Sequence, residues 1–332
     1  MNKPKITIND VAQRAGVSIA TVSRVVNGSQ DVSPALKSRI EHVMAEMDYI
    51  PRRKNRSKGA SSPIKVAFIV NDFSDEVYSS LVKGVLEATG SLNIELVIYE
   101  TQRNPEREIS VLTQLQTHRV NGIISVANLS NLNSEYRKLL KEGFPIVFLM
   151  NPNDPRIRFR DDLNIVTSDS EGPFYAIKYL LDLGHKNILY LGDPKIPRFR
   201  GYKKALESTG EPLNEDLIVD CEDNFEAAYK YLKENFTKVK FSAILAISEE
   251  IGMGCWFALT ELGVRIPEDC SIIGYNNKYA ARLSLTSIAE PLIEQGKNAV
   301  YLLHECMSNN QVTPRSVVLK EGLIVRDSCS KV

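Results

Sequence analysis

Short apolar runs alternate with amphipathic segments over most of this chain, from Ile64 to Arg326. The runs have the length and β-branched content of buried strands, and the segments between them have helical periodicity. This alternation predicts parallel sheets, because each helix carries the chain back across a sheet face. Strands are predicted over residues 64–70, 94–99, 122–127, 145–150, 165–166, 188–192, 217–220, 243–247, 271–275, 317–320 and 323–326.

The segments between these strands predict helices over residues 78–90, 106–117, 134–142, 172–183, 200–209, 225–235, 251–262 and 291–307. A chain of 332 residues is expected to form two or three domains. We therefore predict an α/β body of two doubly wound parallel-sheet lobes. The first covers 64–164 with about 292–316, and the second covers 165–290 with about 317–328. Ligands bind at the carboxyl ends of strands in such sheets, which predicts a site in a cleft between the lobes.

A different pattern precedes the lobes, between Thr7 and Asn27. Gly16 can take a positive φ and end a first helix, and Ser18 can cap a second. The apolar faces of these two helices are formed by Val11, Ala12, Ala15, Val22, Val25 and Val26. Two short helices around a three-residue turn form a helix-turn-helix, which can place its second helix in the major groove of DNA.

The outer face of the second helix is suited to DNA contact. Ile19 and Ala20 can touch thymine methyl groups, and Arg24 can donate two hydrogen bonds to guanine. The hydroxyls of this face suit phosphate oxygens. The alternative from the pattern alone is an ordinary core of two amphipathic helices. Residues predicted to contact DNA, here and in the flanking segments, are Thr7, Ser18, Ile19, Ala20, Thr21, Ser23, Arg24, Asn27, Arg56 and Lys58.

A third amphipathic helix follows, with Ser33 as its cap, Pro34 at its first position and its end near Asp48. We predict a three-helix headpiece over residues 1–50 and a basic hinge linker over 51–63. The first 60 residues hold eleven basic and five acidic side chains, which gives +6. The rest of the 41 basic and 41 acidic residues then carries −6. A basic head on an acidic body is expected where only the head meets a polyanion.

Several function classes lack their usual signals. The five cysteines are widely spaced without a C-x-x-C, so reduced buried thiols are expected rather than disulfides or a zinc site. The four histidines are isolated, no metal or cofactor is predicted, and His185 is expected to be structural. Neither an export signal nor a membrane-spanning apolar run is present, which predicts a cytoplasmic protein without membrane partners.

The run from Ile8 to Asn27, which includes Ala15-Gly16-Val17-Ser18 and Ala20-Thr21-Val22-Ser23-Arg24-Val25, closely resembles the headpiece of the lactose-repressor (LacI/GalR) family. In that family the linker forms a hinge helix that enters the minor groove and wedges a leucine between base pairs. Here the aligned position is Lys58, and only Arg56 matches the family pattern. Because lysine cannot wedge as leucine does, the resemblance does not extend to the kink at the operator centre.

The body also resembles the family's effector domain, a relative of periplasmic sugar-binding proteins. The matching pieces are Asn121-Gly122-Ile123-Ile124, Leu183-Gly184-His185-Lys186-Asn187-Ile188, Arg198-x-x-Gly201-Tyr202, Pro267-Glu268-Asp269 with Ser271-Ile272-Ile273-Gly274-Tyr275, and Leu285-Thr286-Ser287-Ile288. The resemblance implies effector contacts at Tyr78, Arg198, Ser248, Asn276 and Glu290. For Arg198 the alternative is a surface salt bridge, and for Tyr78 it is a core tyrosine.

Other effector positions depart from the family pattern. Ser248-Glu249 and Asn276-Asn277 replace residues that usually accept hydrogen bonds from sugar hydroxyls, Met150 replaces an acid, and Glu290 stands where glutamine is common. One hypothesis is an anionic ligand paired with Arg198, since fewer nearby carboxylates would repel it. The other is a degenerate pocket without a small effector.

Together these features predict a sequence-specific transcriptional regulator, a repressor controlled by a sugar or sugar acid bound between the lobes. One headpiece reads one half-site, so a homodimer on a double-stranded DNA operator is expected, and the lack of a heptad tail gives no support for a tetramer. Two alternatives share the two-lobed fold. A solute-binding protein would not need a basic headpiece. An enzyme would need a nucleophile–base set or a dinucleotide fingerprint, and Gly252-Met253-Gly254 lacks the third glycine of that fingerprint.

Overall fold

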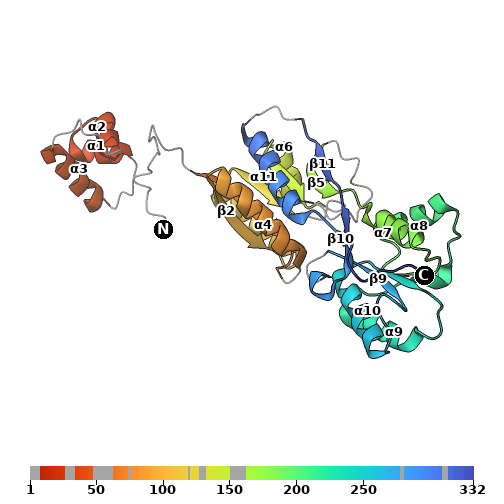
Figure 1. Cartoon of the computed structure of the whole chain (residues 1–332). Coiled ribbons are helices and arrows are strands. Elements are labelled where there is room, and N and C mark those ends of the chain that lie inside the picture. The colour runs from red at the N-terminus through yellow and green to blue at the C-terminus, as the bar shows by residue number, and fades with distance from the viewer. Residues whose placement is uncertain are drawn as a thin grey trace. The chain divides into compact units, whose positions relative to one another are not determined.

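The computed structural model describes residues 8–26, 34–47, 63–73, 76–118, 120–126, 132–149, 162–276, 280–308 and 313–332. The chain divides into two compact units, Met1–Pro63 and Ile64–Val332, which are drawn in Figure 1. Each unit has its own apolar core.

The first unit contains α1 (Ile8–Ala15), α2 (Ile19–Val26) and α3 (Pro34–Glu46). Gly16 has φ +64° and ends α1, and the Ser18 hydroxyl accepts a hydrogen bond from the Thr21 amide at 3.1 Å, which caps α2. The core is formed by Val11, Ala12, Ala15, Val22, Val25, Ile40 and Val43. The predicted helix-turn-helix and third helix are confirmed. The predicted caps Thr7 and Ser33, the Val26 side chain and linker residues 51–62 lie outside the described residues.

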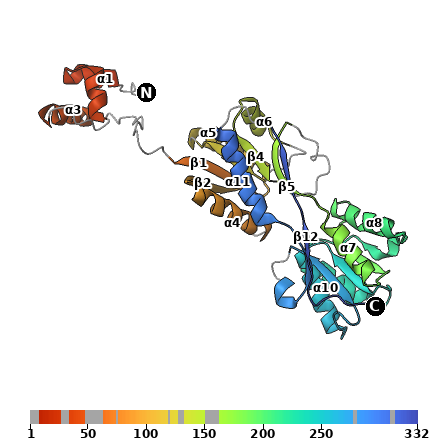
Figure 2. The ribbon, with the colours of Figure 1, turned by 45° about the horizontal axis from the view of Figure 1, so that its top comes forward.

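The first lobe of the second unit is built on a parallel sheet whose order is β11-β5-β4-β3-β1-β2. Its strands are β1 (Ile64–Val70), β2 (Ile94–Glu100), β3 (Gly122–Ser125), β4 (Ile146–Leu149), β5 (Asn164–Ser168) and β11 (Ser316–Leu319). Its helices are α4 (Glu76–Ser91), α5 (Pro105–His118), α6 (Ser134–Lys141) and α11 (Leu292–Ser308). Figure 2 shows α4 and α11 on one side of this sheet and α5 and α6 on the other.

The alternation of side chains along β1 explains this layering. Val66, Phe68 and Val70 pack with α4 and α11, whereas Ala67 and Ile69 pack with α5 and α6. Successive strand residues point to opposite sheet faces, so a strand that is apolar throughout supplies two cores.

The second lobe is built on a sheet whose order is β12-β10-β9-β8-β6-β7. Its strands are β6 (Ile188–Leu191), β7 (Ile218–Val219), β8 (Ala243–Ala246), β9 (Ser271–Tyr275), β10 (Thr286–Ala289) and β12 (Gly322–Ile324). They run parallel except for β12, which pairs antiparallel with β10. Its helices are α7 (Gly172–Asp182), α8 (Arg198–Thr209), α9 (Phe225–Asn235) and α10 (Glu249–Glu261), with short 3-10 turns at Glu215–Leu217 and Ala280–Leu283.

The predicted α/β class is confirmed, but two details of the prediction are wrong. The first is the lobe boundary at 164/165, because β5 pairs with β4 and β11 pairs with β5, so both belong to the first sheet. The second is the list of predicted strands, which lacks residues 286–289, the strand β10. Strands of four or five residues do not reveal from their own pattern which sheet they join, because that depends on pairing partners far away in sequence.

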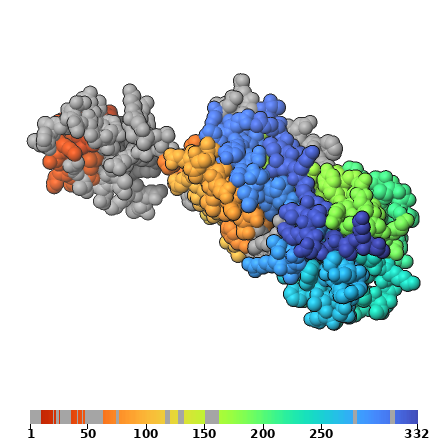
Figure 3. Space-filling model, viewed as in Figure 1, coloured from red at the N-terminus to blue at the C-terminus, as the bar shows by residue number. Residues whose placement is uncertain are grey.

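Three short crossovers connect the lobes, at residues 169–171, 290–291 and 320–321. Each begins directly after a strand of one sheet and leads into an element of the other lobe. Figure 3 shows α11, which follows the second crossover, beside α4 on the surface of the first lobe. The crossovers therefore bring loop residues from three distant parts of the sequence to the junction between the lobes.

The packing of α4 against α11 depends on glycine. A Cβ on Gly84 would lie 2.0 Å from the carbonyl oxygen of Ile293, whereas one on Gly90, in the same helix, would meet nothing within 4 Å. We expect Gly84→Ala to destabilise the protein by about 1–3 kcal/mol through overpacking. Gly90→Ala should be neutral or stabilise it by up to about 1 kcal/mol through helix propensity. Urea unfolding of both variants checks this, and equal effects would contradict the close packing.

His185 ties the C-terminal segment to the second lobe. Its Nδ1 lies 2.8 Å from the Ser242 hydroxyl and its Nε2 lies 3.0 Å from the Ser330 carbonyl oxygen. His185 as a whole is 3% exposed, and burial lowers the pKa of its ring below the ordinary 6.5. The structural role predicted for His185 is therefore confirmed.

A pH dependence of stability follows from this histidine. When the pH falls below about 6.5, the unfolded chain binds a proton on this ring before the folded protein does. The stability that His185 contributes is therefore present above that pH and is lost as the pH falls through the lower folded pKa. Urea unfolding between pH 7.5 and 5.5 should show a steeper loss for the wild type than for His185→Gln. His304→Gln serves as the control and should keep the wild-type slope.

The cysteines and the lengths of the helices can be compared with the expectations from composition. All five cysteines are free, and Cys221, Cys255 and Cys270 are buried. Burial raises the pKa of Cys221 to about 11 and that of Cys270 to about 12, so these thiols stay protonated at neutral pH. Among the helices of the described residues, none has the length and apolar character needed to cross a bilayer.

Candidate functional site

The N-terminal end of α2 presents a small polar and apolar face. Ile19 is 50% exposed although it is a large apolar residue, and it lies directly after the cap residue Ser18. The Ser18 and Thr21 hydroxyls lie 2.8 Å apart and share a hydrogen bond. An exposed isoleucine at a helix start is well placed to contact methyl groups in a DNA groove.

The structure brings together only part of the predicted DNA-contact set. Ser18, Ile19 and Thr21 share the exposed start of α2. The backbones of Ala20, Ser23 and Arg24 belong to the same helix, but their side chains lie outside the described residues. The predictions for Thr7, Asn27, Arg56 and Lys58 also lie outside the described residues.

Arg198, the first residue of α8, lies at the centre of a second, buried site. Its Nη1 donates to the Ile247 carbonyl oxygen at 3.1 Å, and its Nη2 lies 3.4 Å from a carboxylate oxygen of Glu290. Its guanidinium stacks 3.8 Å above the centre of the Tyr275 ring. The Arg198 and Glu290 side chains are 8% and 4% exposed, so this ion pair is buried rather than on the surface.

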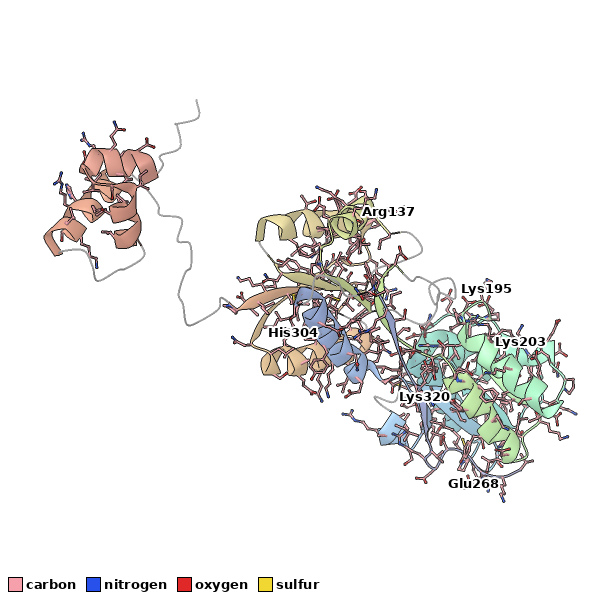
Figure 4. All side chains as sticks on the ribbon, turned by 90° about the horizontal axis from the view of Figure 1, so that it is seen from above. Arg137, Lys195, Lys203, Glu268, His304 and Lys320 are labelled. Carbon is pink, nitrogen blue, oxygen red and sulfur yellow. The ribbon has the colours of Figure 1, made fainter. Side chains whose placement is uncertain are left out.

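Glu321 occupies the third crossover and binds the first. Its carboxylate accepts hydrogen bonds from the Ser168 hydroxyl and from the Gly172 amide, both at 2.9 Å. Its own amide donates to the Asp169 carboxylate at 3.1 Å. Figure 4 labels Lys320, the neighbour of Glu321, at the junction between the lobes. Because Gly172 is the first residue of α7, the Glu321 carboxylate also faces the positive end of that helix.

We call six residues around this junction the interlobe cluster: Ser170, Arg198, Tyr275, Asn276, Glu290 and Glu321. Four of them have a buried polar atom without a hydrogen-bond partner in the described part of the chain: Ser170 Oγ, Arg198 Nε, the Tyr275 hydroxyl and Asn276 Oδ1. Ser170 and Asn276 also have positive φ values, +57° and +72°. Unpaired buried polar atoms and strained backbone are costly, and both concentrate where a ligand is recognised.

The other predicted effector residues have different positions. Ser248 caps α10, and its hydroxyl accepts from the Ile251 amide at 3.2 Å. Tyr78 is 7% exposed and packs in the core of the first lobe, where its hydroxyl accepts from the Asn71 amide group at 3.2 Å. The structure therefore favours the core alternative for Tyr78. It brings Arg198, Asn276 and Glu290 together in the interlobe cluster.

The premise of the anionic-ligand hypothesis is wrong, because Arg198 does not lack nearby carboxylates. Glu290 contacts it directly, and Glu321 is close enough to interact electrostatically with Arg198, Tyr275 and Glu290. Burial raises the pKa of Glu290, although the Arg198 charge opposes that shift. The pKa of the Tyr275 hydroxyl is also raised well above its ordinary value by burial, so it remains a hydrogen-bond donor.

Sequence reasoning missed Ser170, Tyr275 and Glu321 as site residues. Each follows a strand at its carboxyl end or is the last residue of one, and that edge is where doubly wound sheets bind ligands. This position could have singled out Tyr275, at the end of β9. The same criterion could not have identified Glu321, because the strand before it, β11, was predicted to belong to the second lobe.

Two family models match this chain. Residues 7–52 match the family described as bacterial regulatory proteins, lacI family, and residues 177–329 match the periplasmic binding protein-like domain. The HTH-type transcriptional regulator DegA of Bacillus subtilis (strain 168) is 29% identical over 336 residues, which cover 98% of each chain.

Solved structures with the same architecture include a transcriptional regulator CelR–cellobiose complex. It is 25% identical, covers 97% of this chain and 99% of that one, and has a TM-score of 0.68. The lac repressor dimer bound to operator and the anti-inducer ONPF is 23% identical, covers 99% and 100% of the two chains, and has a TM-score of 0.69, which shows a shared fold. With a lacI-type DNA-binding segment before a periplasmic-binding-protein-like body, this chain belongs to the LacI family of bacterial regulatory proteins.

Proposed function

We propose that this protein is a dimeric repressor that binds a double-stranded DNA operator through α2 and releases or tightens it when a small sugar binds at the interlobe cluster. It acts in the cytoplasm, where its DNA target is. Membership of the LacI family supports the regulator role, and the relatives compared are named as transcriptional regulators rather than enzymes. The CelR complex with cellobiose supports a sugar as the effector class.

The observation that carries the effector site is the set of four unpaired polar atoms in the interlobe cluster. Leaving one buried polar group unpaired costs about 1–3 kcal/mol, so a ligand that pairs with these atoms gains binding free energy. Sugar hydroxyls both donate and accept hydrogen bonds, and they can therefore pair with Tyr275, Arg198 Nε and Asn276 Oδ1 together. Binding there recovers interactions that the protein alone does not make.

The route from ligand to DNA runs through the crossovers. Each crossover is two or three residues long, and each contributes a residue to the interlobe cluster: Ser170, Glu290 and Glu321. Short connections at the ends of rigid elements are the usual hinges of two-lobed binding proteins. A ligand that contacts all three favours one arrangement of the lobes, and it thereby changes how a dimer presents its two headpieces.

The solute-binding and enzyme alternatives receive no support from the described residues. The basic helix-turn-helix unit has no role in a solute-binding protein. Arg198 and Glu290 form a buried ion pair, and their role in the proposal is to position hydroxyl groups rather than to transfer protons.

The proposal is tested by selection of bound DNA from random sequence with the full-length chain, repeated with a panel of mono- and disaccharides. We expect enrichment of one sequence with two related half-sites, and at least one sugar that changes its recovery. A sugar that binds should also raise the melting temperature of the protein. Failure to enrich any sequence, with or without sugars, would refute the regulator role.

A further inference from the structure

The interlobe junction has two features that would ordinarily attract an anionic ligand. One is the guanidinium of Arg198. Of the lysine and arginine residues that the structure describes, Arg198 is the one that is buried. The other is the N-terminus of α7, an eleven-residue helix whose first amides point toward the junction at Gly172. In this chain both are already occupied by carboxylates of the protein itself.

Two of the three guanidinium nitrogens of Arg198 already have a partner in the protein. Nη1 is committed to Ile247, Nη2 is paired with Glu290, and one face is covered by Tyr275. Only Nε lacks a partner in the described residues. A ligand carboxylate or phosphate that made the usual two-point contact would have to share a nitrogen with Ile247 or Glu290, and sharing Nη2 would bring two negative groups together.

The N-terminus of α7 is filled by Glu321. Its two carboxylate oxygens accept separately from the Ser168 hydroxyl and the Gly172 amide, and a Cβ on Gly172 would lie 2.6 Å from one of them. Glycine at this position therefore allows the carboxylate to sit directly on the helix end. An incoming anion would meet a buried negative charge where the fold would otherwise offer amide donors.

The interlobe cluster contains more carboxylates than guanidinium groups, which disfavours binding of an acid. Glu290 pairs with the one guanidinium, Glu321 lies at the N-terminus of α7, and a third carboxylate, Asp169, accepts from the Glu321 amide. The four unpaired atoms, by contrast, are two hydroxyls, one N–H donor and one amide oxygen. This set matches alcohol groups, which both donate and accept hydrogen bonds.

We propose that Glu290 and Glu321 are specificity-determining residues that make the interlobe site select uncharged polyhydroxyl ligands and reject their carboxylate- or phosphate-bearing counterparts. The inference rests on the proposed function and narrows its ligand class. It also assigns the family departure at position 290 a role, since a glutamine there would leave Arg198 without a charged partner.

Matched titrations test the inference. Full-length protein is titrated calorimetrically with glucose, glucuronate and glucose 6-phosphate, with galactose and galacturonate, and with ribose and ribose 5-phosphate. We expect at least one neutral sugar to bind about tenfold or more tightly than its acidic counterpart. Preferred binding of an acidic member by the wild type would overturn the inference, while the proposed sugar-responsive function would stand.

Charge-removing variants give the second readout. Glu290→Gln keeps the shape but releases Arg198, and it should raise the affinity for glucuronate or another acidic member about tenfold or more. Glu321→Gln provides the same test at the α7 end if the first variant does not fold. Glu305→Gln, which removes an exposed carboxylate that pairs with Arg315, is the control and should change nothing.

The variants also separate the two proposals. If the wild type binds no member of the panel, the effector part of the proposed function loses its support. The proposed rejection of acidic ligands by Glu290 and Glu321 is then judged by the variants alone. Acquisition of acid binding by Glu290→Gln or Glu321→Gln supports it, and its absence in both folded variants refutes it.

Discussion

An Ile19→Glu variant is expected to lose operator affinity by about 100-fold or more while it keeps its fold. A base contact is worth about 1–3 kcal/mol per half-site, and a dimer makes the contact twice. The new carboxylate also faces DNA phosphates. Because Ile19 is 50% exposed at the start of α2, the substitution removes little packing and places an acid at a favourable helix end. Fluorescence anisotropy with the selected operator measures the loss.

Two further variants make this test specific. Leu213→Glu places the same charge at another exposed apolar residue, in the second unit, and should leave operator affinity unchanged. Ile19→Val keeps an apolar surface and should retain most of the affinity. Undiminished binding by Ile19→Glu would remove the N-terminal end of α2 from the DNA interface.

Replacement of Arg198 by methionine is expected to have the largest effect on the second unit. It leaves the Glu290 carboxylate buried without its ionic partner, and breaking a buried pair costs about 3–5 kcal/mol. The 3.4 Å separation of the two groups places the cost near the lower end of that range. Urea unfolding measures the loss of stability, and calorimetry with the panel sugar measures the loss of binding.

A double variant separates stability from recognition. Arg198→Met with Glu290→Leu replaces the ion pair by apolar side chains of similar volume, and such exchanges are often neutral or stabilising. We expect it to recover most of the stability but not the sugar binding. If the double variant bound the sugar as well as the wild type, Arg198 and Glu290 would have no part in ligand recognition.

The bounds of the helices and strands could be predicted from the sequence more accurately than the pairing of the strands into sheets. Buried strands such as β1 and β9 were found at their observed bounds, because long apolar runs between turn residues have few alternative structures. The strand β10 was missed, since two of its four residues are polar and their hydroxyls bond to main-chain carbonyls rather than to water. Its place between β9 and β12 depends on partners that lie elsewhere in the sequence.

The site shows the same division between local and long-range information. Arg198, Asn276 and Glu290 were predicted from the family resemblance, and the structure brings them together. What could not be predicted was their electrostatic setting. Glu321 is 123 residues from Arg198 and reaches the same junction only because β11 joins the first sheet and β12 joins the second. That assignment turns an apparently acid-poor pocket into one with two buried carboxylates.

Coupling between the interlobe cluster and DNA binding is measured most directly by the operator Kd with and without a saturating sugar from the panel. For the wild type we predict a change of about 5- to 150-fold, the range of ordinary allosteric coupling. The double variant Arg198→Met with Glu290→Leu should bind operator but show no change. An operator Kd that is identical with and without a sugar proven to bind the wild type would contradict the account.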